Sequence, residues 1–355
     1  MFVRRLAIAL LVAAVAVPSR ANVAAVAPAE PVTPVTPPTI DTTAPRTAPA
    51  SSVSDRPPQF IVVSFDGSGD ADLMREWLAT ARAANAHFTF FVSAVYLLPW
   101  EKRTEYQPPR HPAGSSDIGF AASASAAAAI ARSLDDAFAE GSEIATHFGG
   151  HFCPPGAGSV ARWTLTDWRV ELGAVDKLMF RLPAVSPSYA RSALVGARSP
   201  CLAGDGRVLR SALRAAGFRY DASATADEGE WPERVDGIWE FPLALIDRVG
   251  AGDRVLSMDY NFYFNDSGAI DDPANAAAYG ERMRQSYLAY FRASYEGDRA
   301  PLSIGHHFAD WNDGAYREAL RRFVLEVCPM PEVRCVSYAE LADWLDAMPS
   351  PRPLP

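Results

Sequence analysis

The chain has 355 residues, of which 33 are basic and 42 are acidic, and its pI is near 5.2. This mildly acidic balance argues against binding to nucleic acid or to an anionic membrane surface. Hydrophobic residues make up 49% of the chain, enough for a sizeable core, but 29 prolines are too many for a uniformly compact fold. Most of the excess proline lies near the N-terminus, so we expect the globular part to begin later.

Residues 1–21 have the pattern of an export signal. Arg4 and Arg5 precede an apolar run that is too short to span a bilayer as a mature helix. Ser19 and Ala21 place small residues at the two positions that a signal peptidase inspects. We therefore expect cleavage and a secreted or extracytoplasmic protein, with no membrane span in the mature chain. A retained anchor is the alternative.

Residues 22–58 are dominated by Ala, Pro, Thr and Ser, with no periodic apolar pattern that could form a core. This composition is typical of an extended, disordered linker. Residues 59–348 have the composition of a globular protein, and their number suits one large α/β domain better than two small ones. A short tail, residues 349–355, follows.

Within the domain, apolar runs of strand length alternate with helical patterns. The expected strands are residues 60–65, 87–98, 142–147, 218–223, 238–246 and 300–308. The expected helices are residues 70–86, 123–140, 166–180, 207–216, 275–295, 314–327 and 338–348. This alternation predicts a mostly parallel sheet or barrel, in which the chemistry lies at the carboxyl ends of the strands.

Four cysteines are an even set, which in an exported protein predicts two disulfides. Cys328 and Cys335 are near neighbours that could close a small loop, which leaves Cys153 with Cys201. The spacing does not establish this connectivity, and four reduced cysteines are the alternative. Zinc binding by the cysteines is disfavoured because the chain has no Cys-x-x-Cys pair.

Two pairs of histidines stand at the ends of expected strands. His147 and His151 are four residues apart, and this spacing can turn two imidazoles towards one zinc ion. His306 and His307 end a late strand, where a histidine can donate a proton to a leaving group. Adjacent strand residues point to opposite faces, so only one of the second pair should reach a common site. Ordinary loop residues, or core packing for one of the late pair, are the alternatives.

Asp66 ends the first apolar run and is followed at once by Gly67. Arg198 precedes Ser199 and Pro200, a rigid turn entry from which a guanidinium could pair with a carboxylate and hold it ionised. A solvated surface arginine is the alternative for Arg198 alone. Asp66 supplies the possible partner.

In this chain order, these residues resemble the polysaccharide deacetylases of carbohydrate esterase family 4. The family's first motif, Thr/Ser-Phe-Asp-Asp-Gly, is matched in part by residues 64–68. The second, Gly-x-Glu-Ile-x-x-His-Ser/Thr-x-x-His, is matched by residues 141–151 at every position except Phe148, and the third, Arg-x-Pro, by residues 198–200. Later blocks such as GIWEFPLALID and RAPLSIGHHF are most similar to the animal-type chitin deacetylases.

The resemblance implies a distorted (β/α) barrel that removes acetyl groups from an N-acetylated polysaccharide such as peptidoglycan or chitin. It implies that Asp66 is the general base, that Arg198 holds Asp66 charged, and that His307 is the general acid. It also implies that His147 and His151 bind one divalent metal, with zinc as the first choice.

Two positions depart from the family's pattern. Gly67 stands where relatives have an aspartate as third metal ligand, and catalytic zinc sites usually have three protein ligands. Asp70 or Asp72 could replace that ligand if the glycine-containing loop folds back, whereas Asp70 could instead cap the following helix. Phe148 removes the hydroxyl that would sit beside the first histidine.

Three functions follow as hypotheses. A metal-dependent deacetylase is favoured because the base, the acid, the arginine and both histidines are present. Gly67 suggests instead a non-catalytic glycan-binding relative that has lost the metal. The third hypothesis is a metal-independent amide or ester hydrolase in which Asp66 and His307 act as the acid-base pair.

Overall fold

The structure is a computed structural model that describes residues 56–182 and 187–348. The predicted signal peptide, the predicted tail and nearly all of the predicted linker lie outside the described residues. Within the described part of the chain, no helix combines the length and the apolar character needed to cross a membrane.

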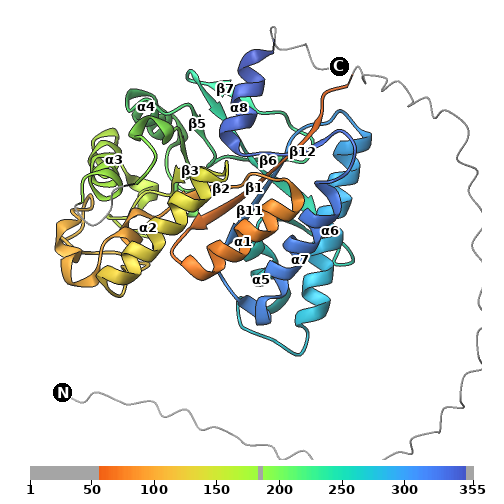
Figure 1. The fold of residues 1–355 in the computed structure, drawn as a ribbon, viewed down its shortest axis with the longest axis horizontal. Coiled ribbons are helices and arrows are strands. Elements are labelled where there is room, and N and C mark those ends of the chain that lie inside the picture. The colour runs from red at the N-terminus through yellow and green to blue at the C-terminus, as the bar shows by residue number, and fades with distance from the viewer. Residues whose placement is uncertain (1–55, 183–186, 349–355) are drawn as a thin grey trace, which may run out of the picture. The chain divides into compact units, whose positions relative to one another are not determined.

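Strand β1 (Gln59–Gly67) is the second strand from one end of the main sheet (Figure 1). All its residues except Gly67 are buried, as is typical of a parallel strand covered on both faces. It lies between β11 (Leu302–His307) and β2 (Thr89–Val92) and is parallel to both. The short strand β12 (Val333–Cys335) pairs with its first residues.

The remaining strands complete two sheets. The nine-stranded sheet has the order β11-β1-β2-β3-β4-β5-β8-β7, with β12 beside β1, and the three-stranded sheet has the order β10-β9-β6. Their bounds are β3 Glu143–Thr146, β4 Gly196–Ala197, β5 Tyr220–Asp221, β6 Thr225–Asp227, β7 Glu233–Val235, β8 Ile238–Glu240, β9 Leu243–Asp247 and β10 Arg254–Leu256. A bridge between Met258 and Gly305 brings the chain after β10 back to β11. The strands thus form a distorted (β/α) barrel, which confirms the predicted fold class.

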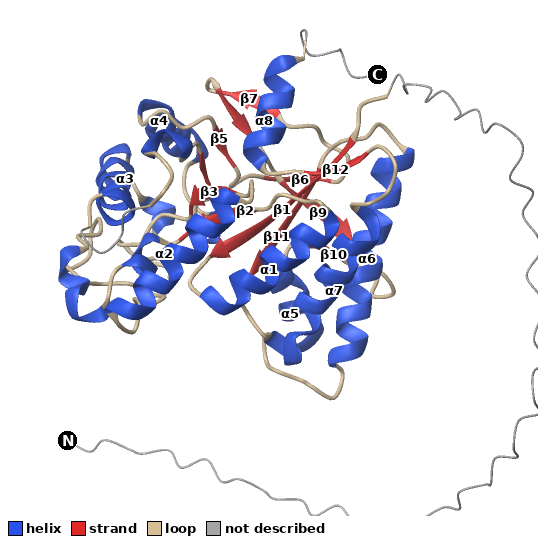
Figure 2. Ribbon diagram, in the orientation of Figure 1, coloured by secondary structure: helices blue, strands red, loops and turns tan. Residues whose placement is uncertain are grey.

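The helices surround the strands (Figure 2). The α-helices are α1 Ala71–Ala84, α2 Ala124–Ala139, α3 Leu165–Phe180, α4 Gly206–Ala215, α5 Asp259–Ser267, α6 Ala276–Glu296, α7 Trp311–Val327 and α8 Tyr338–Ala347. The 3-10 helices are η1 Ala94–Leu97, η2 Trp100–Glu105, η3 Val160–Arg162, η4 Arg191–Ala193 and η5 Pro200–Leu202. Each predicted α-helix is present with similar bounds, whereas α5 was not predicted.

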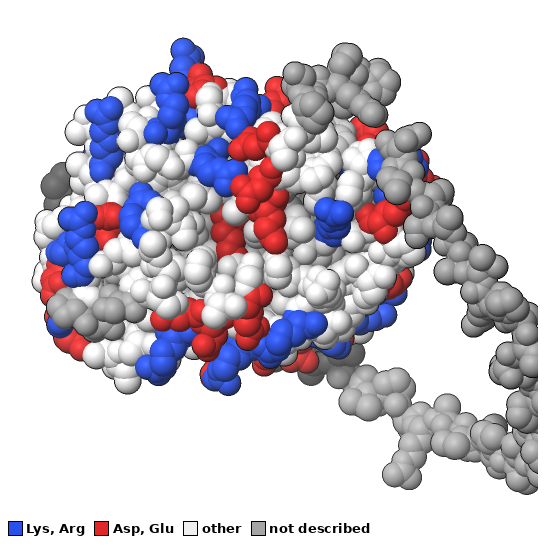
Figure 3. Space-filling model, turned by 45° about the horizontal axis from the view of Figure 1, so that its top comes forward, with Lys and Arg blue, Asp and Glu red and all other residues white. Residues whose placement is uncertain are grey.

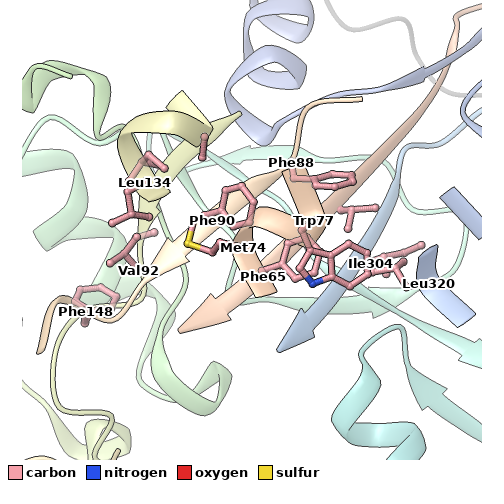
Figure 4. Close-up of a cluster of buried hydrophobic side chains, with 14 of the residues drawn as sticks. Phe65, Met74, Trp77, Phe88, Phe90, Val92, Leu134, Phe148, Ile304 and Leu320 are labelled. Carbon is pink, nitrogen blue, oxygen red and sulfur yellow. The ribbon is translucent and has the colours of Figure 1, made fainter. Parts of the chain in front are cut away.

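The core around β1 is aromatic (Figure 4). The ring centroid of Phe65 on β1 lies 4.6 Å from that of Trp77, 5.6 Å from that of Phe88 and 5.5 Å from that of Phe90. All four side chains are at most 2% exposed. Buried aromatic contacts of this kind stabilise a fold beyond the area they bury, and here they fix β1 against α1 and β2.

Helix α1 begins and ends where the sequence has capping residues. The carboxylate of Asp70 accepts hydrogen bonds from the backbone N–H groups of Asp72 and Leu73. Asn85 adopts the left-handed conformation that often ends a helix. Asp70 therefore serves as the N-cap, which was one of its two predicted roles.

Two of the expected strands are interrupted. The run at residues 87–98 forms β2 and then turns into η1, where the N–H of Ala94 bonds to the carbonyl of Phe148 instead of a strand neighbour. The run at residues 238–246 splits into β8 and β9 around Pro242, which has no N–H to donate to a strand pair.

Both predicted disulfides are present. Cys153 is bonded to Cys201 and Cys328 to Cys335, with Cα–Cα distances of 6.2 Å and 5.6 Å. No cysteine of the described residues is free. The first disulfide joins the loop after β3 to η5, and the second joins the end of α7 to β12.

Charged residues of both signs are interspersed on the face shown in Figure 3. Surface ion pairs of the described residues include Arg82 with Glu140 at 2.7 Å and Arg321 with Glu318 at 2.7 Å. Nucleic-acid-binding surfaces instead gather positive charge into a patch or stripe, which this face does not present.

Candidate active site

An open pocket of about 790 Å³ lies where β1, β3 and β11 end. It is lined by Asp66 from β1, by His147 and His151 from the loop after β3, and by His307 from β11. These residues meet because parallel strands place their carboxyl ends at one edge of a barrel. Arg198, the remaining predicted site residue, is fully buried and contacts Asp66 from within the protein.

Asp66 and Arg198 form a buried ion pair. The Nη1 atom of Arg198 lies 2.9 Å from Oδ1 of Asp66, and the two side chains are 0% and 5% exposed. Burial by itself raises the pKa of Asp66, but Arg198, His147 and His307 together outweigh burial and hold that pKa below its ordinary value. Asp66 is therefore an ionised carboxylate at neutral pH, as a general base has to be.

Several further contacts fix the guanidinium of Arg198. It donates hydrogen bonds to the hydroxyl of Ser64 at 2.9 Å, to the carbonyl of Ala222 at 3.0 Å and to the hydroxyl of Tyr338 at 3.1 Å. The centroid of the Phe91 ring lies 4.4 Å from its Cζ atom, in the range of a cation–π contact. The positive charge is thus held in one place beside the pocket.

His307 is held by Asp259, the first residue of α5. Its Nδ1 atom lies 2.7 Å from Oδ1 of Asp259, and its backbone N–H donates to Oδ2 at 2.8 Å. Burial lowers the pKa of His307, but the Asp259 carboxylate outweighs burial and raises that pKa above its ordinary value. Because the side chain is 30% exposed at the pocket, the protonated imidazole can deliver a proton there.

His306, the neighbour of His307, lies in the core. It is 1% exposed, and its Nε2 atom lies 3.1 Å from the hydroxyl of Tyr287. Burial lowers the pKa of His306 to about 4, so its imidazole is neutral. Of the two adjacent histidines, only His307 lines the pocket.

His147 is placed so that its second nitrogen is available to a ligand. Its Nδ1 atom lies 2.9 Å from the carbonyl oxygen of Arg198, and a carbonyl only accepts hydrogen bonds. Nδ1 therefore carries the proton, and Nε2 keeps its lone pair. Burial lowers the pKa of His147 to about 3, so the imidazole stays neutral, the form that binds metals.

His151 lies on a strained turn beside the first disulfide. Its φ is 59°, a left-handed value that is uncommon outside glycine. Its ring centroid lies 5.1 Å from that of His147, and its Nδ1 atom lies 3.3 Å from Sγ of Cys153. Burial lowers the pKa of His151 as well. The two predicted ligands are thus neighbouring, neutral imidazoles.

Two buried polar side chains, Tyr106 and Glu171, stabilise the turn between these histidines. The N–H of Gly150 donates to the hydroxyl of Tyr106 at 2.8 Å, and this hydroxyl donates to Oε1 of Glu171 at 2.8 Å. A Cβ atom on Gly149 would lie 2.5 Å from that hydroxyl and 2.6 Å from Oε1, so only glycine fits there. Burial raises the pKa of Glu171 to about 7. The sequence offered no sign of Tyr106 or Glu171, because they lie in other elements.

Phe148 has a structural explanation. It is fully buried, and its ring centroid lies 4.8 Å from that of Trp168 on α3. The family's hydroxyl at this position is thus replaced by a core contact that anchors the turn to α3.

The donor set does not fit a tight zinc site. Among the described residues, only His151, Cys153 and Cys201 bring three ligand-type atoms within 4.8 Å of one another, and both cysteines are in a disulfide. His147 and His151 supply two neutral ligands without a carboxylate, whereas catalytic zinc sites usually have three protein ligands.

Among the described residues, neither Asp70 nor Asp72 in the segment after Asp66 forms a three-ligand cluster with the two histidines. Gly67 has a φ of 97°, in which a residue with a side chain is strained, although a Cβ atom there would meet only Tyr96 at 3.7 Å. Asp70 lines the pocket but uses its Oδ1 atom to cap α1, and Asp72 pairs with Arg75 on the surface.

Sequence reasoning missed Asp259, the partner of His307. It follows a short apolar stretch, Val255, Leu256 and Met258, that Ser257 interrupts, so the criterion that singled out Asp66, a carboxylate at the end of an apolar run, points to it only weakly. Tyr260 and Trp311, which also line the pocket, carry no such signal.

We expect Arg198→Met to lower the free energy of unfolding by about 3–5 kcal/mol, because Asp66 would remain buried without its partner. The folded-state pKa of Asp66 lies below its unfolded value. The pair therefore stabilises the protein above the unfolded-state pKa, and this contribution is lost as the pH falls through the folded-state pKa. Urea unfolding at several pH values measures both effects.

Asp66→Asn is the matched second substitution for this experiment. Combined with Arg198→Met it should recover part of the lost stability, because no unpaired carboxylate remains. Equal stability of the wild type and Arg198→Met at neutral pH would contradict the ion pair.

We expect the purified protein to keep less than one equivalent of zinc after exhaustive dialysis. Loss of even an outer partner of a ligand weakens metal binding by about 10- to 100-fold, and here a direct ligand is missing. Elemental analysis, with His147→Ala as the control, measures the bound metal. A full equivalent that survives dialysis in the wild type and disappears in His147→Ala would show that a third ligand exists.

No protein-family model and no curated protein matches the sequence. Solved structures do match. A candidate polysaccharide deacetylase from Mycobacterium smegmatis is 19% identical, with 87% of this chain and 99% of that chain covered and a TM-score of 0.53.

Two further matches have lower scores. A candidate polysaccharide deacetylase from Pseudomonas aeruginosa is 14% identical over 82% of this chain and 92% of that chain, with a TM-score of 0.47. A peptidoglycan deacetylase from Bacillus subtilis is 13% identical over 81% and 92%, with a TM-score of 0.39. At these identities the similarity concerns the fold, and by its fold the chain resembles the polysaccharide deacetylases.

Proposed function

We propose that the protein is a secreted or extracytoplasmic hydrolase that removes acetyl groups from an N-acetylated polysaccharide such as peptidoglycan or chitin. One observation carries the proposal. Asp66 and His307 occupy paired positions on β1 and β11 and line the same pocket. Arg198 keeps Asp66 ionised, and Asp259 favours the protonated form of His307. Groups whose pKa values are pushed apart in this way are the usual partners of acid-base hydrolysis.

The reaction follows from the two roles. Asp66 takes a proton from a water molecule as the water oxygen attacks the acetyl carbonyl carbon. The C–N bond then breaks, and His307 gives its proton to the leaving nitrogen, so that acetate and the free amine depart. Asp259 keeps His307 oriented and favours its protonated form, and Arg198 keeps Asp66 free of its proton at neutral pH.

The proposed reaction does not require a bound metal. The sequence predicts a divalent metal, with zinc as the first choice, on His147 and His151. Two imidazoles without a third protein ligand do not fit a tight site, so neither proton transfer above depends on a metal. Acetate release with and without a chelator separates the metal-dependent reaction from the metal-independent one.

The localisation rests on two features. The N-terminal sequence has the pattern of an export signal. The two disulfides are of the kind that persists in oxidising compartments. A polysaccharide of the cell wall suits such a location.

A glycan-binding protein without activity is the second candidate, and Gly67 is the observation that favours it. A binding protein has no evident need for an ionised carboxylate opposite a protonatable histidine. The acid-base arrangement therefore favours hydrolysis.

We expect Asp66→Asn and His307→Gln each to reduce acetate release by about 10²- to 10⁴-fold, the usual contribution of a positioned acid or base. Acetate is measured from chitin oligomers and peptidoglycan fragments, with and without added zinc. Asp72→Asn, at an exposed position of the same segment, is the control that should keep wild-type activity. No acetate from the wild type under any of these conditions would favour the glycan-binding candidate.

The pH profile tests the contact between Asp259 and His307. His307 acts as an acid only while protonated, so activity should fall as the pH rises through its pKa. Because Asp259 raises that pKa, Asp259→Asn should move this fall to lower pH. If activity falls at the same alkaline pH in Asp259→Asn as in the wild type, His307 is not the general acid.

A further inference from the structure

Helix α5 exposes aromatic side chains beside the pocket. Tyr260 is 44% exposed and Phe264 is 55% exposed, and Ile270, shortly after the helix, is 72% exposed. Thus three of the eight exposed large hydrophobic side chains of the described residues lie between positions 260 and 270. Exposed apolar groups that gather in this way commonly mark a binding surface.

The two aromatic residues lie on one face of the helix. Tyr260 and Phe264 are four residues apart, which places them one above the other, about 6 Å apart along the helix axis. Tyr260 also lines the pocket, whereas Phe264 lies beyond its lining. The aromatic surface therefore continues outwards from the pocket by a distance comparable with the length of a sugar residue.

The inner face of α5 is already packed. Phe262 is 0% exposed and Tyr263 is 6% exposed, and Tyr263 stacks on Trp311 with 5.0 Å between ring centroids and an interplanar angle of 5°. Tyr260 and Phe264 thus stay outside because the core side of the helix is filled.

Helix α5 also contacts His307, the candidate general acid. Its first residue, Asp259, holds His307, and the Trp311 ring centroid lies 5.4 Å from that of His307. A ligand that lies along the outer face of α5 would therefore have a fixed position relative to the nitrogen that His307 is proposed to protonate.

We propose that Tyr260 and Phe264 form a platform for sugar residues of a glycan chain that extends out of the pocket. This inference rests on the proposed function. A pyranose ring has an apolar face of C–H groups that can pack on an aromatic ring, while its hydroxyl groups at the rim stay in water. The platform makes the protein selective for long chains, because only a chain that extends out of the pocket reaches Phe264, which is not part of the pocket lining.

The test compares Phe264→Ser with the wild type on two-sugar and five-sugar fragments of chitin and of peptidoglycan glycan strands. Binding is measured by calorimetry, and acetate release is measured in parallel. We expect affinity and kcat/KM for the five-sugar fragments to fall about three- to tenfold, as for the loss of one aromatic contact, with no change for the two-sugar fragments.

Phe138→Ser is the matched control. Phe138 on α2 is also exposed, at 38%, but it does not line the pocket, and its substitution should change neither value. Thermal unfolding of both variants verifies that each is folded.

The outcomes distinguish the platform from the proposed function. Chain-length-dependent binding that Phe264→Ser removes, in a protein that releases no acetate, supports the platform and contradicts hydrolysis. Equal losses for short and long fragments, or no loss for either, overturn the platform. A wild-type dimer that Phe264→Ser converts to a monomer would also overturn it, because the aromatic face would then bind a second copy of the chain.

Discussion

The buried ion pair between Asp66 and Arg198 is the constraint on which the rest of the site depends. A carboxylate that is 5% exposed cannot remain ionised without a partner, because burial favours its protonated form. The guanidinium that prevents this also bonds to Ala222, which follows β5, and to Tyr338, the first residue of α8. The barrel therefore closes around one fixed positive charge, and the base at the pocket depends on that closure.

A second buried carboxylate, Asp259, pairs with a different kind of partner than Asp66 does. Asp259 faces a histidine where Asp66 faces an arginine, so one pair holds a proton acceptor ready and the other holds a proton donor ready. Both pairs depend on contacts between distant parts of the chain, and α5 supplies Asp259 together with the aromatic platform. In the proposed function, one short helix thus couples the position of the proton donor to the binding of the glycan.

The metal site expected from the sequence is the least complete part of the pocket. His147 and His151 are neutral and adjacent, but the left-handed backbone at Gly67 and the capping role of Asp70 leave them without a carboxylate ligand. Such a ligand would also supply negative charge to offset that of a dication. The pocket thus combines an ionised carboxylate and a protonatable histidine with an incomplete set of metal ligands.

Local sequence was enough for every α-helix except α5, for the ends of β1, β3 and β11, and for the residues that line the pocket from these three strands. Strand ends and capping residues are decided by neighbours in the sequence, as for Asp70 on α1. What only the tertiary structure decided were contacts across the fold, such as Asp259 on His307 and Glu171 beneath the histidine turn. These depend on which faces the packed elements turn towards each other, and no local pattern carries that information.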